Sequence, residues 1–431
     1  MEDGFYFRHG LAPSRERPVI RGAIQTVADV LDRGFSAEPE AEALVGRHAR
    51  YSYRELVVES LRAAAVLADL GVRPGDRVGA CLPNETEIVV AFLGAMRVGA
   101  VWVGVPQAFE THEKLFILDD ADVNVLLADQ ATHDAIQEHR GELRDLNQTL
   151  VAEPGASEWN VALAREEDPA PPEDFDPYGP AAIAYTRGTS GRPKGAVHSQ
   201  HNLLLPGAVV AHESGALPGI RQGVCLPLTT LDQQILGPLL AFQTRGCCVA
   251  MDRSDPVGIA EWVRTERIGT LATEPAMLRD LLSHPDVSAD DLESLVRPRV
   301  VGAELADDTR ALYLERFGGE AVSEYGLSEA PGAVTRTEPE GSAVLNSCGK
   351  ALTHVEVVIL DDGGRELPDG EVGEIALQPA RHGAFAATWT PMLGYWNQPD
   401  ATRAALQGGR LLTGDLGRVD DAGYLFLTGR K

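Results

Sequence analysis

Short apolar runs alternate with helix-like stretches along the first 250 residues, and this alternation limits the possible folds most strongly. The runs lie at residues 77–82, 101–105, 124–128, 181–185 and 247–251. Their length and their β-branched residues are typical of buried strands. Residues 56–70 and 88–96 carry apolar side chains at helical spacing. Strands that alternate with helices predict an α/β fold with mainly parallel sheets under helical cover.

The last hundred residues have a different pattern. Residues 355–367 read as a strand, a glycine-rich turn and a second strand, and residues 370–378 read as a further strand. A chain of 431 residues exceeds the size of a single core, and the proline- and acid-rich residues 166–180 are typical of an exposed connection. We therefore expect two α/β lobes, at about residues 1–175 and 176–338, and a smaller β-rich lobe, a distorted barrel, at about 339–428.

The charge balance limits the partners. Lys and Arg number 38 against 64 Asp and Glu, which gives a net charge of −26. Such a field repels nucleic acids and anionic lipid surfaces, so we expect no nucleic acid partner. A phosphate-bearing ligand would need a local device of backbone amides and a few basic side chains.

The cysteines and the N-terminal residues indicate in which cellular compartment the protein is expected. Five cysteines, an odd number without CxxC spacing, predict neither a disulfide framework nor a zinc site. The N-terminal residues lack the basic and apolar regions of a signal peptide, and no apolar stretch approaches about 18 residues. We expect a cytoplasmic protein without a membrane span.

The sharpest local pattern is YTRGTSGRPKG at residues 185–195, where an expected strand runs into glycines, hydroxyls and a lysine. Glycines let the backbone approach an anion closely, hydroxyls donate hydrogen bonds, and a lysine adds positive charge. The spacing excludes a Walker A loop, and a stretch rich in Gly, Ser and Thr can also be a plain surface turn. The residues suited to phosphate binding are Thr186, Gly188, Thr189, Ser190, Gly191 and Lys194.

This string resembles the phosphate-binding motif of the adenylate-forming superfamily, which contains acyl-CoA synthetases, firefly luciferase and peptide-synthetase adenylation domains. The usual core there is TSGTTGxPKG, so Arg187 replaces a serine and Ser190 a threonine. The segment SEYGLSEA at residues 323–330 resembles the superfamily's YGxTE signature. Further segments match in family order from about residue 51 to residue 431, and the whole is most similar to an acyl-CoA synthetase.

The resemblance implies roles for the second motif. Tyr325 would stack on adenine, Gly326 would leave room near the reacting carboxylate, and Ser328 would contact the α-phosphate. Glu329 would ligate Mg²⁺ on the ATP phosphates, and Glu324 would belong to the nucleotide site. With the phosphate loop, Thr186, Lys194 and Glu329 would be the catalytic residues.

Two further segments complete the implied nucleotide site. Gly302, Ala303 and Glu304 end an expected strand and would form the floor of the adenine pocket, although any strand can end in Gly-Ala. Asp415 would accept hydrogen bonds from both ribose hydroxyls, although an aspartate after glycine is often only a turn former. Arg430 would add a second ribose or phosphate contact.

The acid pocket departs from the family. The usual Pro-x-Phe-His element is replaced by LPLTTLDQQ at residues 226–234, with Thr230, or Leu231 if the gap falls differently, in place of the histidine. An unusual acid is therefore expected. Asp232 lies about one residue out of register with the aspartate that holds an amino group in peptide synthetases, so we expect a plain polar pocket or surface role for it. The residues expected to line the pocket are Thr230, Asp232, Gly302, Gly326 and Pro331.

The sequence ends at Gly429-Arg430-Lys431, where the resemblance places the hinge to a C-terminal domain of roughly a hundred residues. We expect that domain to be absent from this chain and adenylation by it to be weak.

The expected function is ATP-dependent activation of a carboxylic acid to an acyl-adenylate and transfer to CoA, in fatty acid or secondary metabolism, with ATP, Mg²⁺ and CoA as cofactors. One alternative is an adenylation domain that loads an amino or aryl acid onto a carrier protein. Another is a noncatalytic adenylate-binding module, against which the presence of Glu329 and Asp415 argues.

Overall fold

Seven strands form the first sheet of the computed structural model, which describes residues 3–431 except 15, 167–174, 187–191, 214–218, 297, 303–304, 320, 338–343 and 345. The strand order is β18-β8-β7-β4-β3-β5-β6, parallel from β7 to β6 and antiparallel at β8 and β18. The strands are β3 (Arg77–Cys81), β4 (Val101–Gly104), β5 (Val125–Ala128), β6 (Gln148–Val151), β7 (Pro180–Thr186), β8 (Lys194–Ser199) and β18 (Gly394–Tyr395).

The second sheet has nine strands in the order β15-β14-β13-β12-β11-β9-β10-β1-β2. It is parallel from β13 to β1, and β14, β15 and β2 are antiparallel to their neighbours. The strands are β1 (Glu42–Val45), β2 (Arg50–Ser52), β9 (Arg221–Val224), β10 (Cys247–Ala250), β11 (Thr270–Thr273), β12 (Arg299–Val301), β13 (Val322–Leu327), β14 (Ala330–Arg336) and β15 (Lys350–Ala351).

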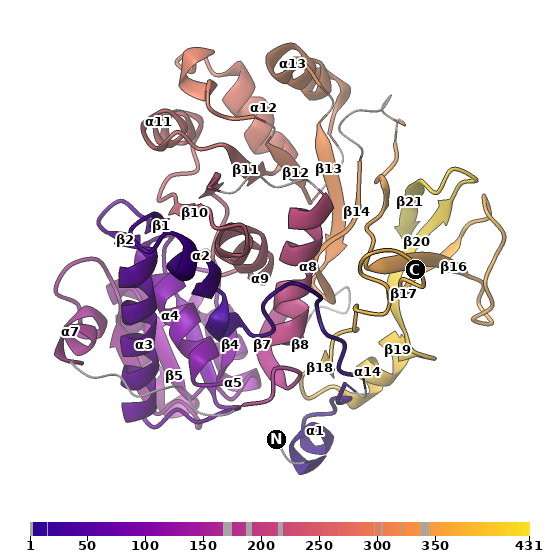
Figure 1. Cartoon of the computed structure of the whole chain (residues 1–431). Coiled ribbons are helices and arrows are strands. Elements are labelled where there is room, and N and C mark those ends of the chain that lie inside the picture. The colour runs from indigo at the N-terminus through magenta and orange to yellow at the C-terminus, as the bar shows by residue number, and fades with distance from the viewer. Residues whose placement is uncertain are drawn as a thin grey trace.

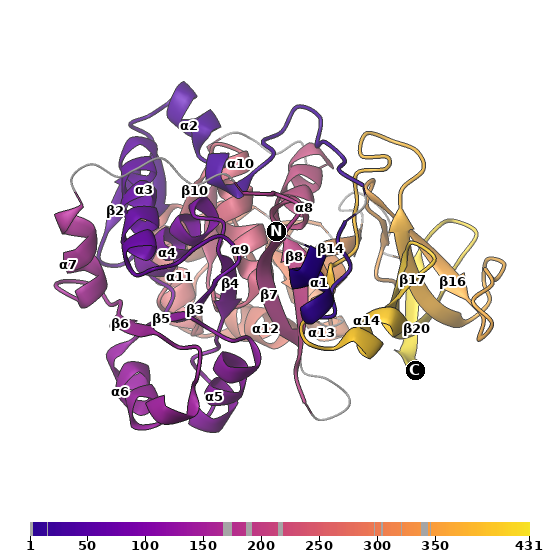
Figure 2. The ribbon, with the colours of Figure 1, turned by 90° about the horizontal axis from the view of Figure 1, so that it is seen from below.

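The third sheet is antiparallel and stands to one side of the other two (Figures 1 and 2). Its strands are β16 (Val355–Leu360), β17 (Gly373–Pro379), β19 (Leu406–Gln407), β20 (Arg410–Val419) and β21 (Leu425–Arg430). The expected second strand within residues 355–367 is wrong. Only an isolated bridge joins Leu360 to Glu366, and β16 pairs with β17 instead because the turn after β16 continues to residue 372.

Helices cover the sheets and fill the space between them. Helix α3 begins with a capping box, in which the Ser52 and Glu55 side chains each bind the other's backbone N–H. Helix α4 is buried along its whole length, and α8 lies between β8 and β14 (Figure 1). The longer helices are α3 (Tyr53–Asp69), α4 (Thr86–Arg97), α5 (Thr111–Asp120), α6 (Gln130–Glu138), α7 (Glu158–Arg165), α8 (Gln200–Glu213), α11 (Pro256–Glu266), α12 (Pro275–Ser283) and α13 (Asp307–Phe317).

Several shorter helical segments connect these elements. They are α1 (Asp3–Arg8), α2 (Asp32–Ala37), α9 (Leu231–Gln234), α10 (Leu240–Gln243), α14 (Pro399–Ala405), the 3₁₀ turns η1 (Val27–Asp29), η2 (Arg140–Glu142) and η4 (Asp290–Leu292), and the π-helical turn η3 (Ile235–Leu239).

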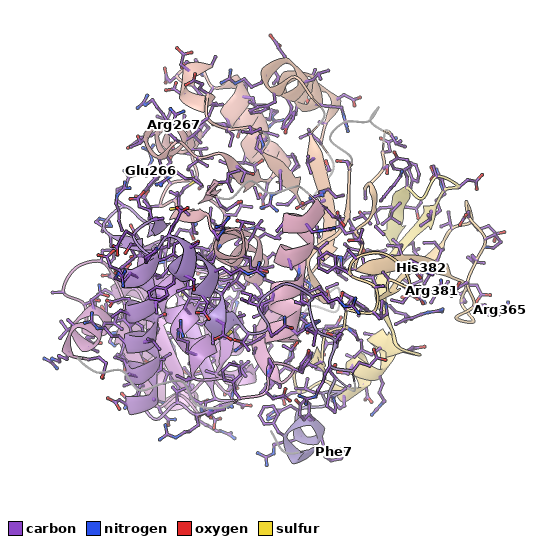
Figure 3. The ribbon with its side chains drawn as sticks, viewed as in Figure 1. Phe7, Glu266, Arg267, Arg365, Arg381 and His382 are labelled. Atoms are coloured by element: carbon purple, nitrogen blue, oxygen red, sulfur yellow. The ribbon has the colours of Figure 1, made fainter. Side chains whose placement is uncertain are left out.

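Aromatic contacts tie the N-terminal segment to Trp396, which directly follows β18 of the first sheet. The ring of His9 stacks on Trp396 at 3.9 Å between centroids, and Phe5 of α1 contacts the same indole at 5.9 Å. Phe7 projects outward from α1 and is 91% exposed (Figure 3). Among the described residues, no helix combines the length and the apolar character needed to cross a membrane.

The mixed α/β fold with mainly parallel sheets and a curled β-rich lobe is confirmed, and all five apolar runs lie in strands. The division of the chain at about residues 175 and 338 stays a prediction. Strands from the two sides of residue 175 pair with each other. In the first sheet β7 pairs with β4, and in the second sheet β10 pairs with β1. The first two lobes are thus interwoven along the sequence.

Candidate active site

A cleft of about 850 Å³ lies where the ends of β7 and β8, the β13–β14 turn and the hairpin of β20 and β21 meet. Most of the residues expected to hold a nucleotide line this cleft, although they come from segments up to 244 positions apart, as for Thr186 and Arg430 (430 − 186). These residues are Thr186, Lys194, Gly302, Tyr325, Gly326, Ser328, Glu329, Asp415 and Arg430. The fold therefore brings these nine residues together at one place.

The other residues expected to hold a nucleotide fall into two groups. Gly188, Thr189, Ser190 and Gly191 of the phosphate loop, and Ala303 and Glu304 after β12, lie outside the described residues. Glu324 is described but does not line the cleft. Its buried carboxylate pairs with the Arg299 guanidinium, 3.3 Å from Nη1 to Oε2, so its nucleotide-binding role stays a prediction.

Asp415 is held between two donors at the base of the cleft. The Tyr325 hydroxyl donates to Asp415 Oδ2 at 2.8 Å, and Arg430 Nε donates to Oδ1 at 2.9 Å from the neighbouring strand. Burial and then the Asp415 charge raise the pKa of the Tyr325 hydroxyl, which keeps it a donor. A ribose diol at Asp415 would have to share or replace these hydrogen bonds.

Glu329 has a partner that sequence reasoning missed. The Tyr395 hydroxyl of β18 donates to Glu329 Oε1 at 2.6 Å, and Lys194 Nζ lies 4.9 Å from the centroid of the Tyr395 ring. Tyr395 therefore links the lysine of the phosphate loop to the expected metal ligand. The Gly-Tyr-Trp string at residues 394–396 falls in a segment that matches the superfamily, but nothing in it indicates which side chain it contacts.

His198 was missed as well, and it orders the backbone at Ser328. Its ring is fully buried, and Nε2 lies 2.7 Å from the Ser328 carbonyl oxygen. Burial lowers the pKa of His198 to about 4, so the ring is neutral at pH 7 and donates from Nε2. A lone histidine in a strand carries no local sequence signal of this kind.

Gly326 is required by a close backbone approach. A Cβ atom at this position would lie 2.2 Å from the Gly332 carbonyl oxygen on β14. The absence of a side chain thus lets β13 and β14 turn tightly and present Ser328 and Glu329 to the cleft.

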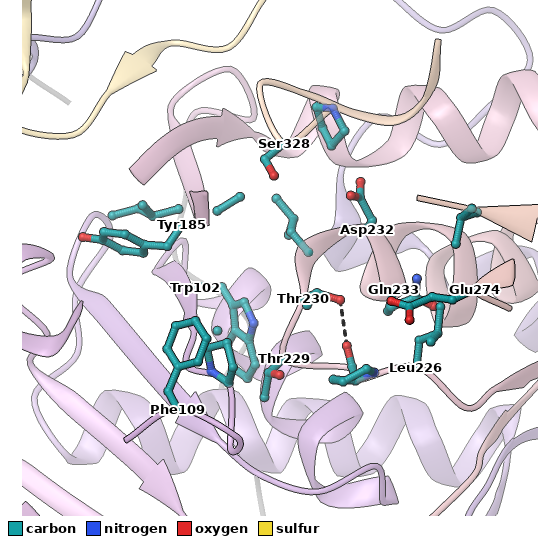
Figure 4. Close-up of a pocket in the computed structure, with 18 residues that line it drawn as sticks. Trp102, Phe109, Tyr185, Leu226, Thr229, Thr230, Asp232, Gln233, Glu274 and Ser328 are labelled. Atoms are coloured by element: carbon teal, nitrogen blue, oxygen red, sulfur yellow. Dashed lines mark hydrogen bonds between the residues drawn. The ribbon is translucent and has the colours of Figure 1, made fainter. Parts of the chain in front are cut away.

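A second, smaller cavity of about 270 Å³ adjoins the cleft, and Tyr185 and Ser328 line both (Figure 4). Three residues expected in the acid pocket, Thr230, Asp232 and Pro331, line it. Gly302 and Gly326, which were expected there too, line the cleft instead.

Asp232 is the most polar group of this cavity. Its Oδ1 accepts the Gly332 backbone N–H at 2.8 Å. Burial raises the pKa of the Asp232 carboxyl to about 6, and the Gly332 hydrogen bond opposes this shift, while the charges of Glu324 and Glu329 add to it. Thr230, the residue in the histidine position, donates its hydroxyl to the Pro227 carbonyl at 2.8 Å.

Comparison with known proteins decides the family. A sequence profile described as AMP-binding enzyme matches residues 31–387, which is most of the chain. The chain belongs to the AMP-binding enzyme family. The expected membership of the adenylate-forming superfamily is thereby confirmed.

Two curated AMP-binding relatives are CoA ligases. The chain is 27% identical over 426 residues to the 3-hydroxybenzoate–CoA ligase of Aromatoleum sp. (strain CIB), covering 95% of this chain and 77% of the relative. It is 29% identical over 399 residues to the crotonobetaine/carnitine–CoA ligase of Escherichia coli O127:H6, covering 89% of this chain and 74% of the relative.

Solved structures of similar enzymes share the fold. Apo MatB from Rhodopseudomonas palustris superimposes with a TM-score of 0.83 at 26% identity, covering 94% of this chain and 78% of that one. The anthranilate CoA ligase AuaEII, solved with anthranoyl-AMP, superimposes with a TM-score of 0.86 at 23% identity and similar coverage of 94% and 77%. The second likeness, at its lower identity, supports the architecture alone.

Proposed function

We propose that this chain activates a carboxylic acid with ATP and that the acyl group is then joined to CoA. The expected class, an AMP-forming carboxylate–CoA ligase, is confirmed by the family and by the CoA ligases among its relatives. The observation that carries the proposal is the junction of the two cavities at Tyr185 and Ser328. An acid in the smaller cavity would meet a nucleotide in the cleft at this point.

The proposed reaction has two steps. A carboxylate oxygen of the acid attacks the α-phosphorus of ATP, and the bond from that phosphorus to the bridging oxygen breaks, so that pyrophosphate leaves. The CoA thiolate then attacks the acyl carbonyl carbon, a C–S bond forms, and AMP leaves with the electron pair of the broken C–O bond of the mixed anhydride. Both steps depend on alignment and on charge stabilisation rather than on a protein nucleophile.

We assign Lys194 and Thr186 to the phosphates, and Ser328 to the α-phosphate; all three line the cleft. Asp415 would hold the ribose, and Tyr325 the adenine. These assignments rest on the resemblance and on the shared cleft.

Glu329 is suited to a magnesium ion. Its Oε1 is occupied by the Tyr395 hydroxyl, while Oε2 makes no hydrogen bond to any other described residue. One carboxylate oxygen together with phosphate oxygens and water is a usual ligand set for Mg²⁺. Bound there, the ion would supply charge neutralisation on the phosphates.

CoA is the proposed acceptor because both relatives named above transfer to CoA. The five cysteines are free thiols, and four of them are buried, which fits the reducing cytoplasm that we propose as the compartment.

The test is acid-dependent exchange of labelled pyrophosphate into ATP, followed by detection of the CoA thioester. Lys194→Ala should lower the exchange rate by roughly 10²- to 10³-fold, the usual cost of losing one charged group at a developing charge. Arg365→Ala, which removes an exposed cation on the β16–β17 connection, is the matched control. Binding of ATP without exchange for any acid of a broad panel would favour a noncatalytic adenylate-binding module.

A further inference from the structure

The smaller cavity carries negative charge without a compensating cation. Asp232 and Glu274 are its two ionisable carboxylates, and the described residues of its lining include no lysine, arginine or histidine. Asp232 Oδ1 is fixed by the Gly332 N–H, whereas Oδ2 has no hydrogen-bond partner within the described part of the chain. Asp232 is partly buried, and a partly buried carboxylate is stabilised when a cation or several donors face it. The lining of the cavity therefore favours a ligand that brings positive charge to Asp232.

Two buried polar atoms of the lining are without a partner in the described structure. They are the indole Nε1 of Trp102, a residue 1% exposed, and the hydroxyl of Thr229, a residue 5% exposed. Figure 4 shows both side chains beside the cavity, opposite Asp232. An unpaired buried donor costs about 1–3 kcal/mol, so a cavity meant for plain hydrocarbon would be better lined without these atoms. They indicate a polar ligand.

Aromatic faces line the same space. Trp102, Phe109 and Tyr185 come from β4, the loop after it and β7, and all three contribute to the wall. Aromatic rings attract cations through their quadrupole, most strongly where water is excluded. The combination of a carboxylate and aromatic rings is the usual chemistry of an ammonium site.

We infer that the smaller cavity binds a carboxylic acid that carries a cationic group, with this cation held by Asp232 and by the aromatic wall. The inference rests on the proposed function and narrows its substrate class. A second carboxylate on the substrate would meet the charge of Asp232 and be repelled. A purely hydrocarbon acid would leave the charge of Asp232 without a counter-charge.

The direct test needs no variant, because two acids of nearly identical shape differ only in charge. These are 4-(trimethylammonio)butanoate and 5,5-dimethylhexanoate, in which a carbon replaces the nitrogen. Calorimetric titration of the chain with each, in the presence of Mg²⁺ and a nonhydrolysable ATP analogue, should give at least roughly tenfold tighter binding of the cationic acid. Glutarate should bind more weakly than either. Equal affinities, or a preference for the hydrocarbon or the dicarboxylic acid, would overturn the inference.

Two variants test which carboxylate causes the preference for the cationic acid. Asp232→Asn keeps the volume and an acceptor for the Gly332 N–H but removes the charge, and it should abolish the preference for the cationic acid. Glu274→Gln removes the other carboxylate, which is exposed and so screened by water, and it should leave most of the preference intact. Loss of the preference in Glu274→Gln alone would refute the role of Asp232.

Pyrophosphate exchange with the same acids separates this inference from the proposed function. Exchange that is supported equally well by the neutral acid would refute the cation site and leave the ligase function standing. Selective binding of the cationic acid without exchange would support the site and count against the ligase function.

Discussion

Asp232 combines a position in the smaller cavity with a carboxyl group whose pKa is raised to about 6. A carboxyl with a raised folded-state pKa contributes most to stability below its unfolded value of about 3.8, and this contribution is lost as the pH rises through 6. At neutral pH the Asp232 carboxyl is therefore ionised within the fold, and this lowers the free energy of unfolding. A carboxyl that lowers stability in this way fits a role in binding better than a role in packing.

We therefore predict that Asp232→Asn stabilises the protein at pH 7.5, by about 1–3 kcal/mol in the free energy of unfolding. The gain should shrink as the pH falls to 5, since the wild-type carboxyl becomes protonated. Urea unfolding at the two pH values measures it, with Glu274→Gln as a variant that should change little. Destabilisation by Asp232→Asn at pH 7.5 would mean that the charge is paired in the fold.

Tyr395 acts through Glu329, so we regard it as a positioning residue. Tyr395→Phe keeps the ring that faces Lys194 and removes the hydroxyl that holds Glu329 Oε1. We predict that the Mg²⁺ concentration needed for half-maximal ATP binding rises by about tenfold, because one hydrogen bond to a charged group is lost. Binding of a metal-free acyl-adenylate analogue, measured by calorimetry, should stay within about twofold. An equal loss for both ligands would indicate a structural role.

At the scale of elements, the β13–β14 hairpin is the part of the fold that presents the second motif. The turn is antiparallel with an irregular register between Tyr325 and Leu327, and His198 of β8 anchors it through the Ser328 carbonyl. The hairpin thus ties the second sheet to the first at the cleft. Its geometry depends on the close approach of two glycines.

Gly326→Ala should break this approach, because the added Cβ would lie 2.2 Å from the Gly332 carbonyl oxygen. We predict a loss of about 1–3 kcal/mol in the free energy of unfolding together with weaker adenylate binding. Gly141→Ala is the matched control, since a Cβ there has no neighbour within 4 Å. If Gly326→Ala had the same thermal unfolding midpoint and the same adenylate affinity as the wild type, the hairpin would have to adjust to the added Cβ atom, and the prediction would be wrong.

At the scale of the whole molecule, the net charge of −26 opposes the approach of anionic ligands. Lys194 and Arg430 supply a local positive contribution within the cleft, but their reach is limited to about a Debye length. The long-range part of the field should therefore slow the encounter with ATP and CoA.

We predict that the association rate constant of ATP rises a few-fold as ionic strength increases from about 20 to 200 mM, because salt screens the repulsion. Stopped-flow fluorescence with a labelled nucleotide measures this rate, and a neutral adenosine analogue serves as the control. A rate that falls with salt would show that the basic groups of the cleft dominate the approach.

Many of the strands and many of the candidate site residues could be predicted from local sequence pattern. Apolar runs marked β3, β4, β5, β7 and β10 because burial on both faces of a parallel sheet imposes continuous hydrophobicity. Motif residues such as Lys194, Tyr325 and Asp415 were identified by type and order, and the structure places them in one cleft.

Contacts between distant segments were decided only by the tertiary structure. The pairing of β16 with β17, the hydrogen bond from Tyr395 to Glu329 and the meeting of Trp102 with Asp232 in one cavity leave no local trace. Periodicity reports which face of an element is buried, but the partner on that face is chosen by packing between elements. The sequence by itself therefore determined the family, most of the kinds of element and a set of candidate nucleotide-site residues. The shape and charge of the smaller cavity followed only from how distant segments pack together.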